Sequence, residues 1–213
     1  MPTSAKEVIP EVVRHLRELK PSSILDIGVG FGKVGYLARE YLEVWSGRYD
    51  KSEWKTKVYG IEAFERYRNP AWDFYYDKVL IGDANQLIDD VPQVDLITCL
   101  DVIEHFEKRE GTIFLEKCLA KARHVIISSP IKFHAQDAVF GNVHEVHRSH
   151  WREEDFRDYD YLFQALPPVF VCRLWKRPAG ANPTRVRQNR LAFASGRELA
   201  RELVKRVVKR VKP

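Results

Sequence analysis

The stretch that decides the fold runs Ser23-Ile24-Leu25-Asp26-Ile27-Gly28-Val29-Gly30-Phe31-Gly32. Its first half predicts a short buried strand, its second half is a glycine-rich turn, and residues 33–42 follow with a helical pattern. Glycines at such a turn let the backbone approach a ligand closely, and the following helix presents free N–H groups to it. Gly30 and the residues after it also match the GxGxxG spacing of dinucleotide-binding proteins, which alone is weak evidence.

The alternation of strand and helix continues along the chain. Further strands are expected at 57–62, 78–81, 94–100 and 124–129, and further helices at 5–19 and 112–122. This order indicates βαβ units and a parallel sheet. Two last β-prone runs, 161–165 and 169–175, are too close together for a crossover helix, so we expect an antiparallel pair at the sheet edge. The predicted fold class is α/β, a Rossmann-like doubly wound sheet of seven strands whose last strand is antiparallel.

Acidic residues follow three consecutive predicted strands and help to choose between ligands. Asp26 lies just before the first glycine, where a carboxylate repels a pyrophosphate but suits a cationic amine. Glu62 ends the second strand and is placed to accept hydrogen bonds from both ribose hydroxyls. Asp83 follows the third strand and is placed to accept from an exocyclic adenine amine. Together they favour an adenosine ligand that carries an amino group over NAD.

With these acids the sequence resembles the class I S-adenosylmethionine-dependent methyltransferases. The matching segments are ILDIGVGFG, YGIEAF, IGDA and VDLITCLDVIEHF, in family order between residues 22 and 106. The resemblance implies S-adenosylmethionine as cofactor, with its ribose at Glu62 and its adenine at Asp83 and Ala84. The methionine portion falls on Asp26 and the loop glycines, which are Gly28, Gly30 and Gly32. An unrelated Rossmann-like fold or an inactive relative is the alternative.

The fourth predicted strand ends in Asp101-Val102-Ile103-Glu104-His105, at the edge where an open α/β sheet binds its ligand. We expect Asp101 to support the cofactor. The candidate catalytic residues are His105 and Glu104, either of which would act as general base, and His147 from a later loop. The alternative is that Glu104 and His105 are structural. Because a sulfonium methyl group is already activated, transfer mainly needs in-line positioning, with deprotonation added for a hydroxyl acceptor.

The loop after the fifth predicted strand is rich in histidine. His144, His147 and His150 follow one another at intervals of three residues, a spacing that suggests a metal site which the stretch ending in His105 would join. This arrangement resembles the small-RNA 3′-end 2′-O-methyltransferases, where acids and histidines from these two regions hold Mg²⁺. It also departs from them, because its first acid is Asp101 and its histidine spacing differs. We expect a polar substrate loop and no metal. In addition, residues 45–57 look like an insertion that is polar between its aromatic residues, and we expect it to be a substrate lid.

Charge is unevenly distributed along the 213 residues, which contain 35 Lys and Arg and 30 Asp and Glu. From residue 173 to residue 213 there are 13 basic residues and only Glu198 and Glu202 as acids, so this end carries +11 and the remainder −6. We expect a methyltransferase domain at 1–178, followed by a basic linker and an amphipathic C-terminal helix at 179–213. This tail is expected to be solvated, or to contact an anionic membrane or nucleic acid.

Composition excludes several other classes of protein. The chain is 45% hydrophobic and 31% charged, and no apolar run approaches the roughly 20 residues that span a bilayer. It begins without a signal-peptide pattern, and Cys99, Cys118 and Cys172 are too scattered for a disulfide framework or a zinc site. We therefore expect a cytoplasmic protein that reaches a membrane surface only through its tail.

The predicted function is methyl transfer from S-adenosylmethionine to an oxygen or nitrogen of a small molecule or saccharide. One alternative is a metal-assisted RNA 2′-O-methyltransferase. The other is a non-catalytic S-adenosylmethionine-binding scaffold in which the tail is the functional part.

Overall fold

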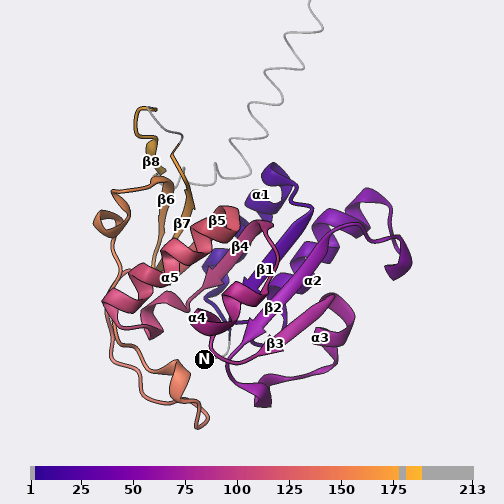
Figure 1. The fold of residues 1–213 in the computed structure, drawn as a ribbon, viewed down its shortest axis with the longest axis horizontal. Coiled ribbons are helices and arrows are strands. Elements are labelled where there is room, and N and C mark those ends of the chain that lie inside the picture. Colours follow the sequence, from indigo (N-terminus) through magenta and orange to yellow (C-terminus); the bar gives the residue numbers. More distant parts are fainter. Residues whose placement is uncertain (1–2, 178–180, 189–213) are drawn as a thin grey trace, which may run out of the picture.

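The computed structural model describes residues 3–177 and 181–188. Its sheet has eight strands in the order β3-β2-β1-β4-β5-β7-β6-β8 (Figure 1). The strands are β1 (Ser23–Ile27), β2 (Lys57–Glu62), β3 (Lys78–Ile81), β4 (Val94–Leu100), β5 (Ala122–Pro130), β6 (Asp160–Leu166), β7 (Val169–Trp175) and β8 (Arg185–Gln188). Strands β1 to β5 are parallel, whereas β7 runs antiparallel to both β5 and β6. The strand order reverses between β1 and β4, where doubly wound folds bind their ligands.

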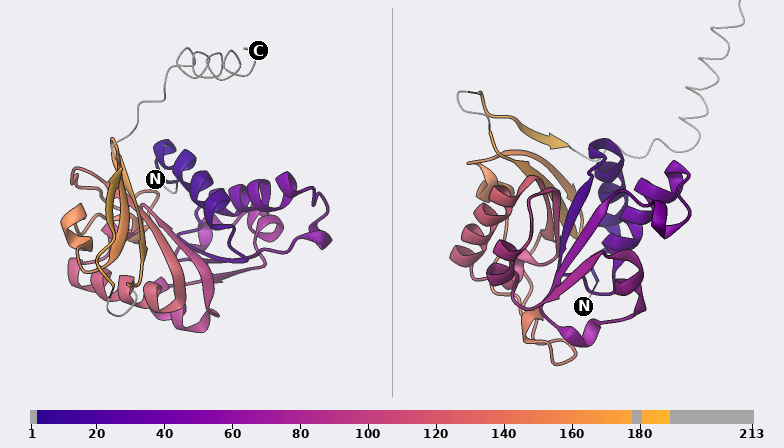
Figure 2. Two further views of the ribbon diagram at one scale, coloured as in Figure 1. Left: turned by 90° about the horizontal axis from the view of Figure 1, so that it is seen from above. Right: turned by 45° about the vertical axis from the view of Figure 1, so that its right-hand side comes forward.

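Helices cover both faces of the sheet (Figures 1 and 2). They are α1 (Ile9–Leu19), α2 (Lys33–Ala38), α3 (Pro70–Tyr75), α4 (Ala84–Leu87) and α5 (Lys108–Lys121). On one face, Phe114 and Leu119 of α5 pack with buried residues of the strands, and on the other face Val12 of α1 and Leu37 of α2 do so. Such three-layer burial leaves only the sheet edges and the strand ends accessible. None of the helices in the described part of the chain has the length and apolar content needed to cross a bilayer.

The predicted sheet is confirmed and is extended by one strand. All seven expected strands are present, and the seventh, β7, is antiparallel and inserted between β5 and β6. The sequence analysis missed β8, which falls within the segment predicted to be a linker and pairs in parallel with β6. Asp160 fixes this strand by accepting a hydrogen bond from the Thr184 N–H at 2.8 Å. The predicted C-terminal helix lies outside the described residues.

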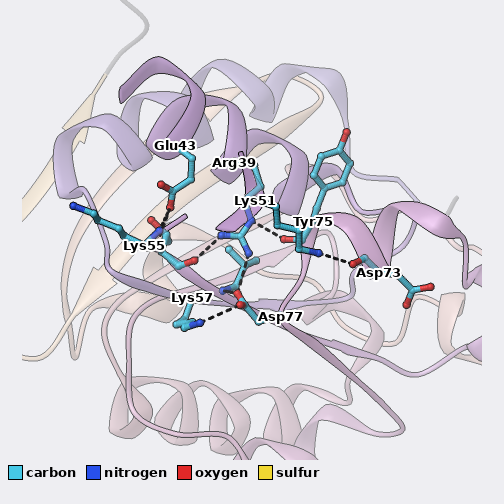
Figure 3. A network of polar contacts seen from close by, with 10 residues as sticks. Arg39, Glu43, Lys51, Lys55, Lys57, Asp73, Tyr75 and Asp77 are labelled. Atoms are coloured by element: carbon cyan, nitrogen blue, oxygen red, sulfur yellow. Dashed lines mark hydrogen bonds and ion pairs between the residues drawn. The ribbon is translucent and has the colours of Figure 1, made fainter. Parts of the chain in front are cut away.

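The insertion at 45–57 lies at the amino ends of the strands, whereas a lid would have to cover the carboxyl ends, where the ligand binds. It follows α2 and leads into β2, and the Lys57 N–H donates to the Ser22 carbonyl just before β1. Arg39 fixes it from inside, because its guanidinium donates to the carbonyls of Tyr75 and Thr56 and to Asp77 (Figure 3). The prediction of a substrate lid is therefore wrong, since a segment between a helix and the next strand returns to the amino ends of the strands.

Candidate functional site

A cavity of about 420 Å³ opens at the carboxyl ends of β1, β2 and β4. The predicted cofactor residues that line it are Asp26, Gly28, Gly30, Glu62, Asp83, Ala84 and Asp101. Gly32 does not line it. It stands at the start of α2 with a φ of +90°, and its carbonyl accepts from the Tyr36 N–H. The structure thus brings three segments that are distant in sequence around one hollow at the topological switch point.

Gly28 shows why the turn is built from glycine. Its φ is +76°, and a Cβ atom at this position would lie 2.5 Å from Cγ2 of Val102. The Gly28 N–H donates to the carbonyl of Ile61 at 2.9 Å, so the turn is held between β2 and the end of β4. A side chain at this position would both strain the backbone and narrow the cavity.

Glu62 joins the glycine turn to the end of β2. Its carboxylate accepts from the Gly30 N–H at 2.8 Å and from the Phe64 N–H at 2.9 Å. Burial raises its pKa, and these backbone donors oppose that shift. Each carboxylate oxygen has a second lone pair, so Glu62 retains the capacity to accept from the hydroxyls of a ribose in the cavity.

Asp26 is fully enclosed at the floor of the cavity. Its two carboxylate oxygens accept from the hydroxyls of Tyr76 at 2.6 Å and Thr98 at 2.8 Å. Burial raises its pKa from 3.8 to about 7, although both hydroxyl donors act in the opposite direction. The contact of Asp26 with a ligand amine stays a prediction, and the bonds within the protein show that Asp26 also holds β1 to β4 and to Tyr76.

Asp101 separates this cavity from a neighbouring one. It has a left-handed φ of 54°, which is uncommon for a residue other than glycine. Its carboxylate accepts from the Ser128 hydroxyl at 2.6 Å and from the Ala5 N–H at 2.9 Å. A strained residue held this firmly at a strand end is typical of a functional site.

The N-terminal segment contributes residues to the site that the sequence analysis missed. Thr3 and Ser4 line the first cavity, and the Lys33 ammonium donates to the Ser4 carbonyl at 2.6 Å. Tyr67 also lines the cavity, and its hydroxyl donates to Glu145 at 3.1 Å while accepting from the Asn142 side chain. Nothing local in the sequence links these residues to the site, because each reaches it from a segment outside the recognised motifs.

The second cavity has a volume of about 740 Å³ and meets the first at Thr3, Asp101, His105 and Glu145. Part of its wall is apolar and is formed by Ala5, Pro130, Ile131, Pro167, Pro168 and Val169. All three predicted catalytic residues, Glu104, His105 and His147, also line it. If the first cavity holds one ligand, this adjoining position is where a second ligand would meet it.

Glu104, His105 and His147 converge at one point of the second cavity. One side-chain ligand atom from each lies within 4.8 Å of the other two. The His105 Nδ1 lies 3.1 Å from the Val146 carbonyl, and the His147 Nδ1 lies 2.9 Å from the His134 carbonyl. A carbonyl can only accept, so both Nδ1 atoms carry hydrogen and each neutral ring keeps its lone pair on Nε2.

Burial sets the charge of this cluster. Burial raises the pKa of Glu104 well above its ordinary value, and the neighbouring Asp101 raises it further. Burial also lowers the pKa of His105 and of His147, which favours their neutral forms. Glu104 is 2% exposed, and its Oε2 has no hydrogen-bond partner. In the absence of a ligand the raised pKa favours the protonated form of Glu104, whereas a bound cation would favour its carboxylate form, in which all three side chains offer acceptors.

The three evenly spaced histidines of the loop do not converge. His147 joins His105, but His144 lines the first cavity and the His150 Nε2 lies 2.9 Å from the Ile131 carbonyl. Among the described residues, the grouping that could hold a metal ion consists of Glu104, His105 and His147. Sequence spacing failed here because the loop is irregular and follows no helical period.

No family model and no curated protein matches this sequence. Solved structures of methyltransferases do match its fold. The methyltransferase domain of bacterial CtHen1 has 17% identity and a TM-score of 0.57, over 80% of this chain and 98% of that one. The small RNA methyltransferase HEN1 has 18% identity and a TM-score of 0.59, over 86% of this chain and 27% of that one. Magnesium protoporphyrin IX methyltransferase from Synechocystis, with bound SAH, has 16% identity and a TM-score of 0.55, over 80% of this chain and 83% of that one.

Proposed function

We propose that this chain, which has the fold of the class I S-adenosylmethionine-dependent methyltransferases, binds that cofactor and transfers its methyl group to an oxygen or nitrogen of a small molecule or saccharide. The observation that carries the proposal is the first cavity. In it, the glycine turn, Glu62, Asp83 and Asp101 surround one hollow at the switch point of the sheet. This is the set of contacts that an adenosine ligand with an amino group needs.

The cofactor supplies an activated methyl group. The residues of this chain would hold the cofactor and the acceptor in position and form polar contacts with them. Glu62 would hold the ribose, and the backbone at Gly28 and Gly30 would follow the methionine portion closely. Asp83 lines the cavity and is held in place by accepting from the Asn85 N–H at 2.8 Å. The second cavity, which adjoins the first at His105, would hold the acceptor within reach of the methyl group.

Calorimetry with S-adenosylhomocysteine tests this proposal. We expect binding that Glu62→Ala weakens at least tenfold, about 1.4 kcal/mol, because the variant removes the acceptor for the ribose hydroxyls. Glu65→Ala is the matched control, since Glu65 is exposed on the neighbouring turn and should leave the affinity unchanged. A wild-type protein that fails to bind S-adenosylhomocysteine would refute the proposal. Binding without transfer of labelled methyl to any acceptor in broad extracts would favour a non-catalytic scaffold.

A second candidate function is metal-assisted 2′-O-methylation of RNA. It is favoured by the convergence of Glu104, His105 and His147, and by the fold shared with the small RNA methyltransferase HEN1. A carboxylate and two imidazoles fit a divalent cation, and these three residues would hold it. The ion would supply Lewis-acid activation of an acceptor hydroxyl. Methyl transfer that chelators leave unchanged would exclude this candidate.

A further inference from the structure

We propose that the acceptor of this methyltransferase is a primary amine, bound as its ammonium ion by Glu104, His105 and His147 in the second cavity. The inference rests on the proposed function, and it selects nitrogen from the two acceptor atoms that the function leaves open. Geometry, hydrogen-bonding capacity and the charge of the lining all support it.

Hydrogen-bonding capacity is the first argument. The backbone carbonyls of Val146 and His134 occupy the Nδ1 positions of His105 and His147, so the remaining nitrogen of each neutral ring can only accept. Glu104 adds Oε2, a buried oxygen without a partner. With Glu104 in the carboxylate form that a bound cation favours, the three side chains offer three acceptors to a primary ammonium group, which has three donors and no acceptor. A hydroxyl group donates only once and would leave two of the three unsatisfied.

The spacing of the acceptors is the second argument. One ligand atom from each of the three side chains lies within 4.8 Å of the other two. Around an ammonium nitrogen, acceptors at about 2.9 Å in tetrahedral directions stand about 4.7 Å apart. Three acceptors within this limit can therefore contact one ammonium nitrogen.

The charge of the residues that line the second cavity also favours an ammonium ligand. Asp101, Glu104 and Glu145 line the second cavity, and Lys132 is the cationic side chain among its described lining residues. This excess of carboxyl groups favours a cation and disfavours a phosphate chain. The apolar wall, which includes Ile131 and Val169, suits an acceptor with a compact apolar face.

Methyl transfer to the amine begins with the loss of a proton. The ammonium ion loses one proton to an imidazole of the cluster and becomes a neutral amine with a free electron pair. That pair forms a bond to the methyl carbon of S-adenosylmethionine, the carbon–sulfur bond breaks, and its electrons remain on sulfur as S-adenosylhomocysteine. The product is an N-methylated ammonium ion, and the imidazole then releases its proton to water.

The test uses cyclohexylamine, cyclohexanol and cyclohexanecarboxylate as matched probes of the full chain saturated with S-adenosylhomocysteine. The three share a body and differ in the group offered to the cluster. We expect cyclohexylamine to bind at least ten times more tightly than cyclohexanol, and the carboxylate to bind least. Glu104→Gln should remove the advantage of the amine, because its amide offers donors where the carboxylate accepts. Glu154→Gln, an exposed position outside both cavities, is the matched control.

The outcomes separate this inference from the proposed function. Loss of S-adenosylhomocysteine binding in the wild type refutes the proposed function itself. If that binding is intact, equal or tighter binding of cyclohexanol overturns the amine assignment, and so does an absence of amine binding. Binding of Mn²⁺ alone that Glu104→Gln abolishes would overturn it in favour of a metal site. Retention of S-adenosylhomocysteine affinity by Glu104→Gln shows that the variant is folded.

Discussion

Two buried carboxyl groups at the floors of neighbouring cavities are held in different ways. Asp26 and Glu104 are each 2% exposed. Asp26 has both of its oxygens paired with hydroxyl donors, from Tyr76 and Thr98, whereas Oε2 of Glu104 has no partner. Burying an acid without donors is costly, so a protein retains such a group where a ligand completes it. The paired oxygens of Asp26 tie it to the framework, whereas the unpaired oxygen of Glu104 supports the binding role proposed for it above.

The local structure explains the difference. Asp26 is part of β1, at the centre of the sheet, where the neighbouring strand β4 supplies Thr98. Glu104 lies on a short 3₁₀ turn, Ile103–His105, after the end of β4. The carbonyl of Glu104 accepts from the N–H groups of Arg148 and Ser149, so its backbone fixes the histidine loop while its side chain faces the cavity.

The largest expected effect is on the pH dependence of stability. Burial raises the pKa of Asp26 from 3.8 to about 7, so the folded state binds more protons than the unfolded state between these values. The contribution of Asp26 to the free energy of unfolding is thus highest below pH 3.8 and falls as the pH rises through 7. From pH 4.5 to 7.5 this contribution should fall by about 3 kcal/mol, and Asp26→Asn should remove it.

Urea unfolding of the wild type and of Asp26→Asn at both pH values measures this difference. Other groups titrate over the same range, and burial lowers the pKa of His15 to about 2, which gives stability the opposite slope. Only the difference between the two proteins therefore isolates Asp26. Asp137→Asn, on an exposed loop, serves as the control and should follow the wild type. Parallel curves for the wild type and Asp26→Asn would contradict the raised pKa.

The next effect concerns the backbone of the first cavity. Gly28→Ala should weaken S-adenosylhomocysteine binding by roughly 30-fold, about 2 kcal/mol, because the new Cβ meets Val102 and the left-handed backbone is strained. Gly47→Ala is a matched control, since Gly47 also has a left-handed φ, of +81°, but nothing lies within 4 Å of its Cβ position. Gly47→Ala should lose about 1 kcal/mol of stability and keep its affinity. Equal affinities for the two variants would show that the turn does not shape the cavity.

The contrast between the two cavities also explains which site residues can be predicted from the sequence. The first cavity is built from short motifs that directly follow strands, so Gly28, Glu62 and Asp83 could be located from the alternation of strands alone. The second cavity is built from loops. The pairing of His147 with His105 depends on an irregular segment that the Glu104 carbonyl and the Gln136 side chain hold in place. Contacts of this kind leave no periodic signal in the sequence.

The predictions for β8 and for the insertion at 45–57 failed for different reasons. Residues 185–188 are Arg-Val-Arg-Gln, which lack the apolar alternation of a strand, and pairing with the edge strand β6 decides their conformation. The lid prediction for the insertion rested on its aromatic residues, which suggested substrate contact. Its position between a helix and the next strand already assigns it to the amino ends of the strands, away from the ligand.

The smallest expected effect is the stability of Glu104→Gln. Asp26→Ala would leave the Tyr76 and Thr98 hydroxyls without their acceptor and should lower the free energy of unfolding by about 1–3 kcal/mol. Glu104→Gln replaces a group whose Oε2 already lacks a partner, so its free energy of unfolding should stay within about 1 kcal/mol of the wild-type value. Urea unfolding of the two variants at one pH makes the comparison. A loss for Glu104→Gln as large as that for Asp26→Ala would place Glu104 in the framework, whereas an unchanged stability together with lost amine binding separates the two acids by role.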